Sequence, residues 1–67
     1  MLTKENASYM LLSFRCEHKK TQEHVADKTG VSVQTISQIE NGQIKSPQAM
    51  TLFKLNNYIG LFKDKDK

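Results

Sequence analysis

Residues 21–42 read TQEHVADKTGVSVQTISQIENG, and this stretch decides how the chain folds. It predicts two short helices joined by a turn at Gly30, where glycine permits the left-handed backbone of a tight reversal. Apolar residues mark the inner faces of the two helices, namely Val25 and Ala26 in the first and Ile36 and Ile39 in the second. This spacing predicts two helices held at a fixed angle by a small residue, a glycine and apolar side chains.

Helix start and stop signals recur along the rest of the chain and predict an all-α domain. Serine, threonine and asparagine side chains can accept hydrogen bonds from free backbone N–H groups at helix starts. Candidate caps are Thr3 or Asn6, Thr21, Ser32 and Ser46, the last followed by Pro47 at a first helical position. The predicted helices are Glu5–Glu17, Gln22–Thr29, Val33–Asn41 and Pro47–Tyr58.

The glycines and the helical spacing of apolar residues also predict the core. Gly42 closes the third helix and Gly60 ends the fourth, which leaves Leu61 and Phe62 beyond it. The predicted inward side chains are Ala7, Met10, Leu11 and Phe14 in the first helix, with Met50 or Ala49, Leu52, Phe53, Leu55 and Ile59 in the fourth.

Size and composition indicate one small globular domain. The chain has 67 residues, 37% of them hydrophobic, and we expect residues 1–62 to form the domain and residues 63–67 a charged, solvated tail. A single cysteine, Cys16, excludes an internal disulfide framework and is expected to lie in the core or at its boundary. No apolar run is long enough for a membrane span. The net charge of +3 is compatible with a nucleic-acid partner.

The outer face of the predicted helix 33–41 is uncharged and rich in amides. Gln34 and Gln38 lie four apart and share a face, and each amide can make two hydrogen bonds to adenine in a major groove. Val33 and Thr35 offer methyl groups to thymine. The alternative is that these glutamines are simply polar helix formers, which composition alone would favour.

The whole pattern resembles the Cro and XRE family, the lambda-repressor-like regulators of phages and bacteria. The matching features are the TQ at 21–22, the VA at 25–26, the GV at 30–31, the ISQIENG at 36–42 and a proline at 47, within about 11–61. The resemblance implies a lambda-repressor-like bundle of four or five helices that binds double-stranded DNA and regulates transcription. It also implies dimeric binding to palindromic operators, with helix 33–41 in the major groove, no cofactor, and a place in the cytoplasm of a bacterial host.

The resemblance, with helix-end electrostatics, also suggests contacts to the DNA backbone. Thr21 and Gln22 lie at a helix start, where free N–H groups and the helix dipole attract phosphate. Asn41 and Lys45 match backbone-touching positions, and Ser37 and Gln43 are weaker candidates. Lys45 is the best candidate for a salt-dependent phosphate contact, and a solvated loop lysine is its alternative.

The resemblance implies two structural roles as well. Arg15 matches an arginine that pairs with the glutamate at Glu40, which would tie the first helix to the third. Lys19 and Lys20 depart from the family, which usually has a small and then an apolar residue there. The dimer candidates are Tyr58, Leu61 and Phe62, which would give a weak homodimer completed on DNA.

The sequence leaves competing functions open. His18 and His24 lie six apart with Cys16 nearby, too far apart and too few for a metal site. No nucleophile, phosphate loop or carboxylate pair indicates an enzyme. The leading hypothesis is a Cro-type DNA-binding regulator; the alternatives are a protein-interaction module on the same fold (an antirepressor or a partner of another regulator) and an antitoxin.

Overall fold

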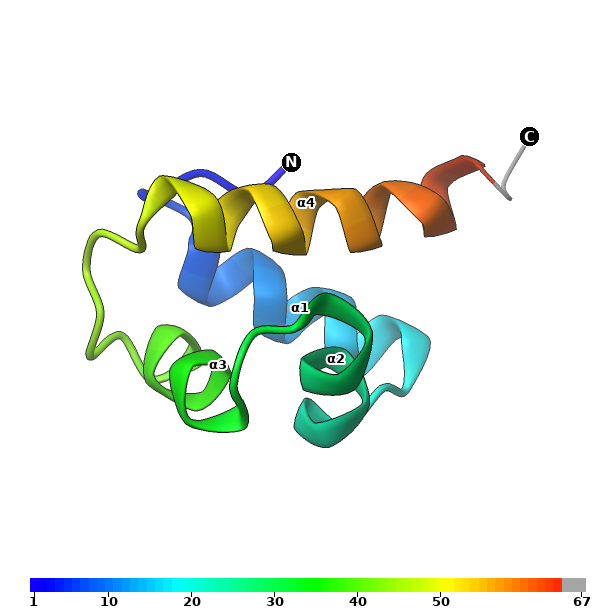
Figure 1. Ribbon diagram of the computed structural model, residues 1–67, viewed down its shortest axis with the longest axis horizontal. Coiled ribbons are helices and arrows are strands. Elements are labelled where there is room, and N and C mark those ends of the chain that lie inside the picture. Colours follow the sequence, from blue (N-terminus) through cyan, green and yellow to red (C-terminus); the bar gives the residue numbers. More distant parts are fainter. Residues whose placement is uncertain (65–67) are drawn as a thin grey trace.

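The chain folds into four helices, as the sequence predicts. The computed structural model describes the backbone of residues 1–64 and the side chains of residues 1–62. The helices are α1 (Ala7–His18), α2 (Gln22–Thr29), α3 (Val33–Glu40) and α4 (Ala49–Asp64), and no strand occurs within that part of the chain. In Figure 1, α4 lies across one side of the molecule over α1, and α2 and α3 form the opposite side. None of the described helices is long and apolar enough to cross a membrane.

The predicted caps set the ends of α2 and the start of α3. The Thr21 hydroxyl accepts from the His24 N–H at 3.0 Å, and the Ser32 hydroxyl accepts from the Thr35 N–H at 3.1 Å. Gly30 ends α2 with a φ of 81°, and its N–H donates to the Ala26 carbonyl at 2.9 Å. A side chain is rarely tolerated at such a φ, so glycine is what allows the reversal between the two helices.

The start of α1 differs from the expectation by two residues. The Asn6 N–H donates to the Thr3 hydroxyl at 3.3 Å, and the Thr3 N–H donates to Asn6 Oδ1 at 2.7 Å. This reciprocal pair forms a separate turn ahead of Ala7, so both cap candidates are used, although neither side chain caps α1 itself. Lys19 ends α1 in a left-handed conformation, with φ at 56°.

The predicted bounds of α4 are wrong at both ends. The helix begins at Ala49 instead of Pro47, whose ring is buried, and it continues through Gly60 to Asp64. Because the helix continues past Gly60, Phe62 packs against Phe14 and Tyr58, with ring centroids 5.1 Å apart in each pair. That burial outweighs the small helix cost of glycine. Residues 63 and 64, assigned to the tail by the sequence, are therefore helical, and residues 65–67 lie outside the described residues.

The core is one cluster shared by all four helices and the N-terminus. Val25, Ile36, Ile39 and Leu55 are fully buried, and the predicted stripe of α1 faces them. The predicted inner face of α4 is partly wrong, because Ala49 is exposed and Met50 and Phe53 are 61% and 60% exposed. Tyr58, which shares the inner face with Leu55 at helical spacing, is buried instead. Cys16 is exposed and belongs neither to the core nor to its boundary.

The N-terminal segment is fastened to α4. The Leu2 N–H donates to Asn56 Oδ1 at 2.7 Å, and Asn56 Nδ2 donates to the Leu2 carbonyl at 3.0 Å. The Leu2 side chain is only 3% exposed. The N-terminal segment is thereby joined to the middle of α4, and Figure 1 shows the N-terminus beside that helix.

Candidate nucleic-acid interface

Helix α3 is anchored from one side and open on the other. Ile36 and Ile39 are fully buried and hold it against α1 and α2. Gln34 is exposed, and the remaining predicted base-reading side chains are half-buried, namely Val33, Thr35 and Gln38. Eight residues make a rod of about 12 Å, which is short enough to enter a major groove.

The two glutamine amides of α3 have no hydrogen-bond partner among the described residues. Only the backbone of Gln38 is engaged, because its carbonyl accepts from the Gln43 N–H at 2.9 Å and the Ile44 N–H at 3.3 Å. Thr35 differs, since its hydroxyl accepts from the Ser32 hydroxyl at 2.9 Å. The arrangement therefore leaves both amides without a hydrogen bond inside the described part of the chain.

The two side chains at the start of α2 that are predicted to contact phosphate are not equally available. Thr21 is exposed, and its hydroxyl can still donate while it accepts from His24. Gln22 is half-buried, and its Nε2 donates to Glu40 Oε1 at 3.0 Å. A side-chain amide has two N–H donors, so one remains for a phosphate. The sequence did not indicate that Gln22 also supports Glu40.

The residues after α3 form the other flank of the face. Asn41, Gln43 and Lys45 are all exposed, and the structure leaves the Lys45 ammonium facing solvent. Asn41 Nδ2 donates to the Ser37 hydroxyl at 3.5 Å, the limit of a hydrogen bond, and Ser37 itself is half-buried. Gly42, with φ at 76°, turns the chain away from α3 and so presents this segment at the helix end.

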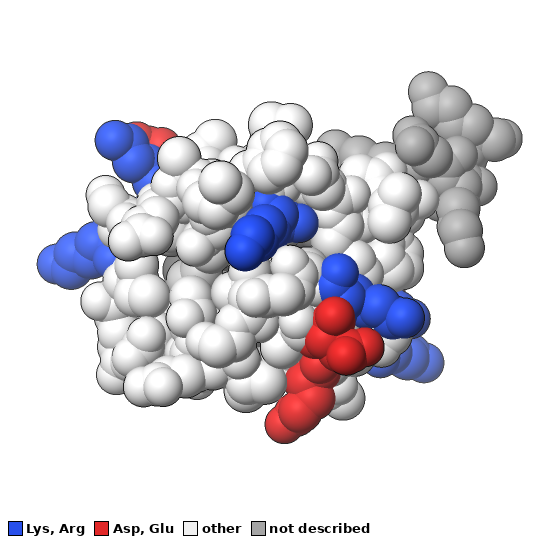
Figure 2. All heavy atoms as spheres, in the orientation of Figure 1, with Lys and Arg blue, Asp and Glu red and all other residues white. Residues whose placement is uncertain are grey.

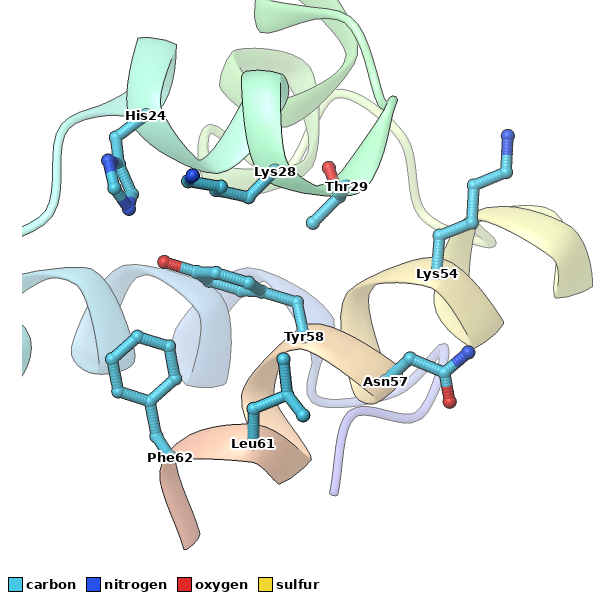
Figure 3. A pocket seen from close by; sticks show the side chains of 8 residues that line it. All are labelled: His24, Lys28, Thr29, Lys54, Asn57, Tyr58, Leu61 and Phe62. Atoms are coloured by element: carbon cyan, nitrogen blue, oxygen red, sulfur yellow. The ribbon is translucent and has the colours of Figure 1, made fainter. Parts of the chain in front are cut away.

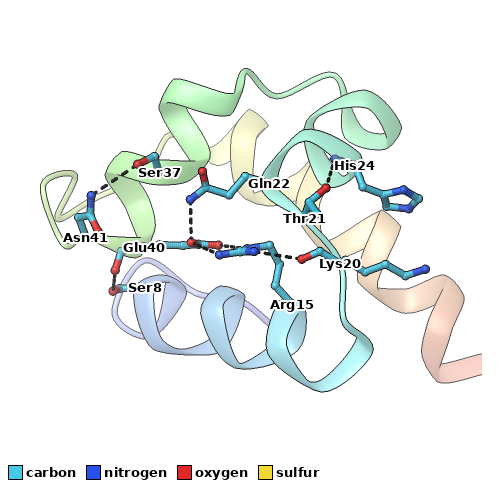
Figure 4. Close-up of polar contacts among 9 residues, drawn as sticks. All are labelled: Ser8, Arg15, Lys20, Thr21, Gln22, His24, Ser37, Glu40 and Asn41. Carbon is cyan, nitrogen blue, oxygen red and sulfur yellow. Dashed lines mark hydrogen bonds and ion pairs between the residues drawn. The ribbon is translucent and has the colours of Figure 1, made fainter.

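An ion pair fixes the end of α3 to α1 (Figure 4). Arg15 Nε donates to Glu40 Oε2 at 2.6 Å, and Nη2 donates to Oε1 at 2.8 Å. The Arg15 Nη1 reaches the Lys20 carbonyl at 3.0 Å, and Ser8 Oγ donates to the Glu40 carbonyl at 2.9 Å. The hydrogen bond with Glu40 raises the pKa of Arg15, so the guanidinium stays charged at every pH of interest. Glu40 is therefore neutralised locally and adds little repulsion toward a phosphate backbone.

Lys19 and Lys20, which depart from the family pattern, each have a structural role. Lys19 takes the left-handed position that ends α1. Lys20 Nζ lies 5.6 Å from the centroid of the Phe62 ring, where an ammonium is attracted to the ring face. Its aliphatic stem can occupy the space of an apolar residue while the charge stays at the surface.

The dimer candidates are only partly available. Tyr58 is 7% exposed in the core of its own chain, so it offers little surface to a dimer contact. Phe62 packs on Phe14 and on His18. Leu61 is 62% exposed and is the one of the three that presents a large apolar surface.

Charge is distributed without one dominant patch on the face drawn in Figure 2. Lys and Arg side chains are scattered over it, and the acidic side chains lie beside basic ones, mostly at the lower right. No group of three or more metal-ligating side chains lies together in the described chain. On this face, therefore, no single charged patch dominates the electrostatic field.

A pair of capped helices, a glycine turn and an outward amide face define a helix-turn-helix domain. A family model described as helix-turn-helix matches residues 11–61. The chain belongs to this family, of the Cro and XRE type, and is a DNA-binding regulator in the general sense. No curated protein and no solved structure matches the chain in the other two comparisons.

Proposed function

We propose that the chain is a sequence-specific transcriptional regulator of the Cro or repressor type, without enzymatic activity. Its α3 would enter the major groove of an operator half-site in the cytoplasm of a bacterial host. One observation carries this proposal: α3 is held rigidly by buried isoleucines and by the Arg15–Glu40 pair, while its amide face is unpartnered among the described residues. Such a preorganised polar rod fits base edges.

The residues divide into base readers and backbone contacts. Gln34 and Gln38 would make bidentate contacts, and the methyl groups of Val33 and Thr35 would contact thymine. Phosphates would be held by the groups on both flanks of α3, namely Thr21, Gln22, Ser37, Asn41, Gln43 and Lys45. Of these, Lys45 adds a full positive charge and should carry the salt dependence.

A symmetric pair of chains would read a palindromic site. With Leu61 the main exposed dimer candidate, the contact between two chains is small compared with the roughly 1,200–2,000 Å² of stable interfaces. The homodimer would therefore be weak in solution and completed on DNA, where both half-sites hold a chain.

Selection of bound duplexes from a random pool, at a stated salt concentration, tests the proposal. We expect enrichment of one short motif in two inverted copies about one helical turn apart. A pool that stays random at low salt would contradict DNA reading and would favour the protein-interaction module. An antitoxin would also yield a motif, so co-purification with a toxin partner is the observation that separates that case.

Single substitutions then assign the roles. Gln34→Ala and Gln38→Ala should each lose about 1–3 kcal/mol of preference for the selected site. Gln48→Ala, at an exposed glutamine outside α3, is the matched control and should change nothing. Lys45→Ala should instead weaken binding to all duplexes. It should also reduce the slope of log affinity against log salt concentration by about one, which corresponds to one released counterion.

A further inference from the structure

A groove of about 980 Å³ lies between α2 and α4, away from the proposed DNA face (Figure 3). Its walls are His24, Lys28 and Thr29 from α2, and Lys54, Asn57, Tyr58, Leu61 and Phe62 from α4. No residue of α3 lines it. The groove is open to solvent, so it suits a segment of another chain more than an enclosed small molecule.

The lining combines apolar surface with positive charge. Lys28 lines the groove from α2 and Lys54 from α4, and Figure 3 shows Tyr58 facing Lys28 while Lys54 stands at the far end of the α4 wall. None of the residues that line the groove is acidic. Carboxylates that enter the groove can therefore approach an ammonium group at either end and meet no acidic side chain in the lining, whereas a basic segment would be repelled.

A buried polar group in the groove also lacks a partner. Tyr58 is 7% exposed, and its hydroxyl has no hydrogen bond within the described part of the chain. In Figure 3 the hydroxyl end of its ring lies on the side of His24. Buried hydroxyl groups are normally paired, so an acceptor delivered by a bound partner would satisfy this one after a small shift of His24.

We propose that the α2–α4 groove binds another protein through a short segment that carries carboxylates beside apolar side chains. The apolar side chains pack on Leu61 and Phe62, and the carboxylates approach Lys28, Lys54 and the Tyr58 hydroxyl. This site is separate from α3, so one chain can hold DNA and the partner segment at the same time, and the segment shares only Leu61 with the main dimer contact proposed above. The proposal does not depend on the DNA-binding function.

Selection of a library of random twelve-residue peptides on the immobilised full chain tests the proposal. The expected winners combine aspartate or glutamate with leucine, isoleucine or phenylalanine. An NMR titration with a winning peptide should shift the amide signals of Lys28, Lys54 and Leu61. Winners without acidic residues, an unenriched library, or shifts confined to α3 would each overturn the proposal.

Charge-neutral variants test the lysines directly. The double change Lys28→Gln with Lys54→Gln should weaken peptide binding at least tenfold. Lys4→Gln with Lys19→Gln removes the same net charge elsewhere and should change it less than twofold. Equal effects from the two pairs would show a general charge effect and contradict a built groove.

Two further measurements separate this site from other occupants. An acidic peptide that merely mimics DNA would be displaced by excess selected duplex, and such displacement would overturn the proposal. Shifts at Lys28 and Lys54 that grow with chain concentration, without peptide, would assign the groove to a second copy and would also overturn it, whereas the weak homodimer predicts such a shift at Leu61 alone. Duplex binding by the Lys28 and Lys54 double variant is measured in parallel, so failure of DNA binding is seen independently.

Discussion

Glu40 shows how one side chain can hold two helices and the recognition surface together. Its side chain is 4% exposed, and it accepts hydrogen bonds from Arg15 and from Gln22. A carboxylate this buried is tolerated because charged donors replace its lost hydration. The intact pair therefore adds little net stability, whereas loss of one member leaves a buried charge without a partner and is costly.

Arg15→Ala should strongly destabilise the fold. It leaves the Glu40 carboxylate buried beside Gln22 alone, and breaking such a pair costs about 3–5 kcal/mol. For a domain of this size, that cost lowers the melting temperature by more than about 10 °C. Circular dichroism melts of Arg15→Ala, Glu40→Ala and the double variant would measure it. The double variant should be more stable than additivity predicts, and strict additivity would show that the pair does not couple the two helices.

Tyr58 provides a pH test of the core. Burial raises the pKa of its hydroxyl above the ordinary value of 10.0, because the tyrosinate would lose its hydration. The folded state thus holds its proton where the unfolded state releases it. The contribution of the Tyr58 hydroxyl to the free energy of unfolding is fully present below pH 10, and it is lost as the pH rises through the pKa of the folded state. Denaturant melts between about pH 9 and about pH 11, which bracket the tyrosine pKa, should show a fall that Tyr58→Phe reduces. Tyr9→Phe, at a 73% exposed tyrosine, is the control, and an equal reduction there would refute the assignment.

At the scale of elements, the sequence predicts local features well and tertiary ones poorly. The bounds of α2, the Thr21 and Ser32 caps and the Gly30 turn were all correct, because each depends on hydrogen bonds within a few residues. The ends of α4 were wrong because they are decided by contacts with distant parts of the chain. Pro47 and Gly60 are local start and stop signals, and packing of Phe62 against α1 overrides the second of them.

Gly60 and Gly30 should respond to alanine with opposite signs. Gly60 is helical, and a Cβ there would meet nothing within 4 Å, so Gly60→Ala should stabilise the domain by about 0.5–1 kcal/mol. Gly30 also has room, but its φ of 81° strains any side chain, so Gly30→Ala should destabilise by about 1 kcal/mol or more. Urea titrations of both variants provide the comparison. A destabilised Gly60→Ala would show that α4 ends near Gly60, as the sequence alone predicted.

At the scale of the whole molecule, the sequence predicts the candidate DNA-binding face better than it predicts the contacts that hold α3 in place. The face of Gln34 and Gln38 follows from the spacing of Ile36 and Ile39, because a short amphipathic helix has only one way to bury its apolar side. Whether these amides read bases stays a prediction. Of the contacts that hold α3 in place, the Arg15–Glu40 pair is implied by the family resemblance. The Gln22–Glu40 and Ser8–Glu40 hydrogen bonds could not be foreseen, since they join residues 18 and 32 positions apart. No local pattern encodes such contacts.

The contact between the N-terminal segment and α4 also joins residues that are far apart in the sequence. The Asn56 side chain makes two hydrogen bonds to the Leu2 backbone, 54 positions away, and holds the Leu2 side chain in the core. Asn56→Ala should cost about 1–3 kcal/mol, because it leaves the part-buried Leu2 backbone unpaired and loosens Leu2. Asn57→Ala, at the exposed neighbour, gains the same helix propensity without losing this contact. Hydrogen exchange at the Leu2 amide should accelerate in the first variant only. Equal melting temperatures for the two variants would mean that the Asn56–Leu2 hydrogen bonds contribute nothing to stability, and that burial of the Leu2 side chain alone holds the N-terminal segment on α4.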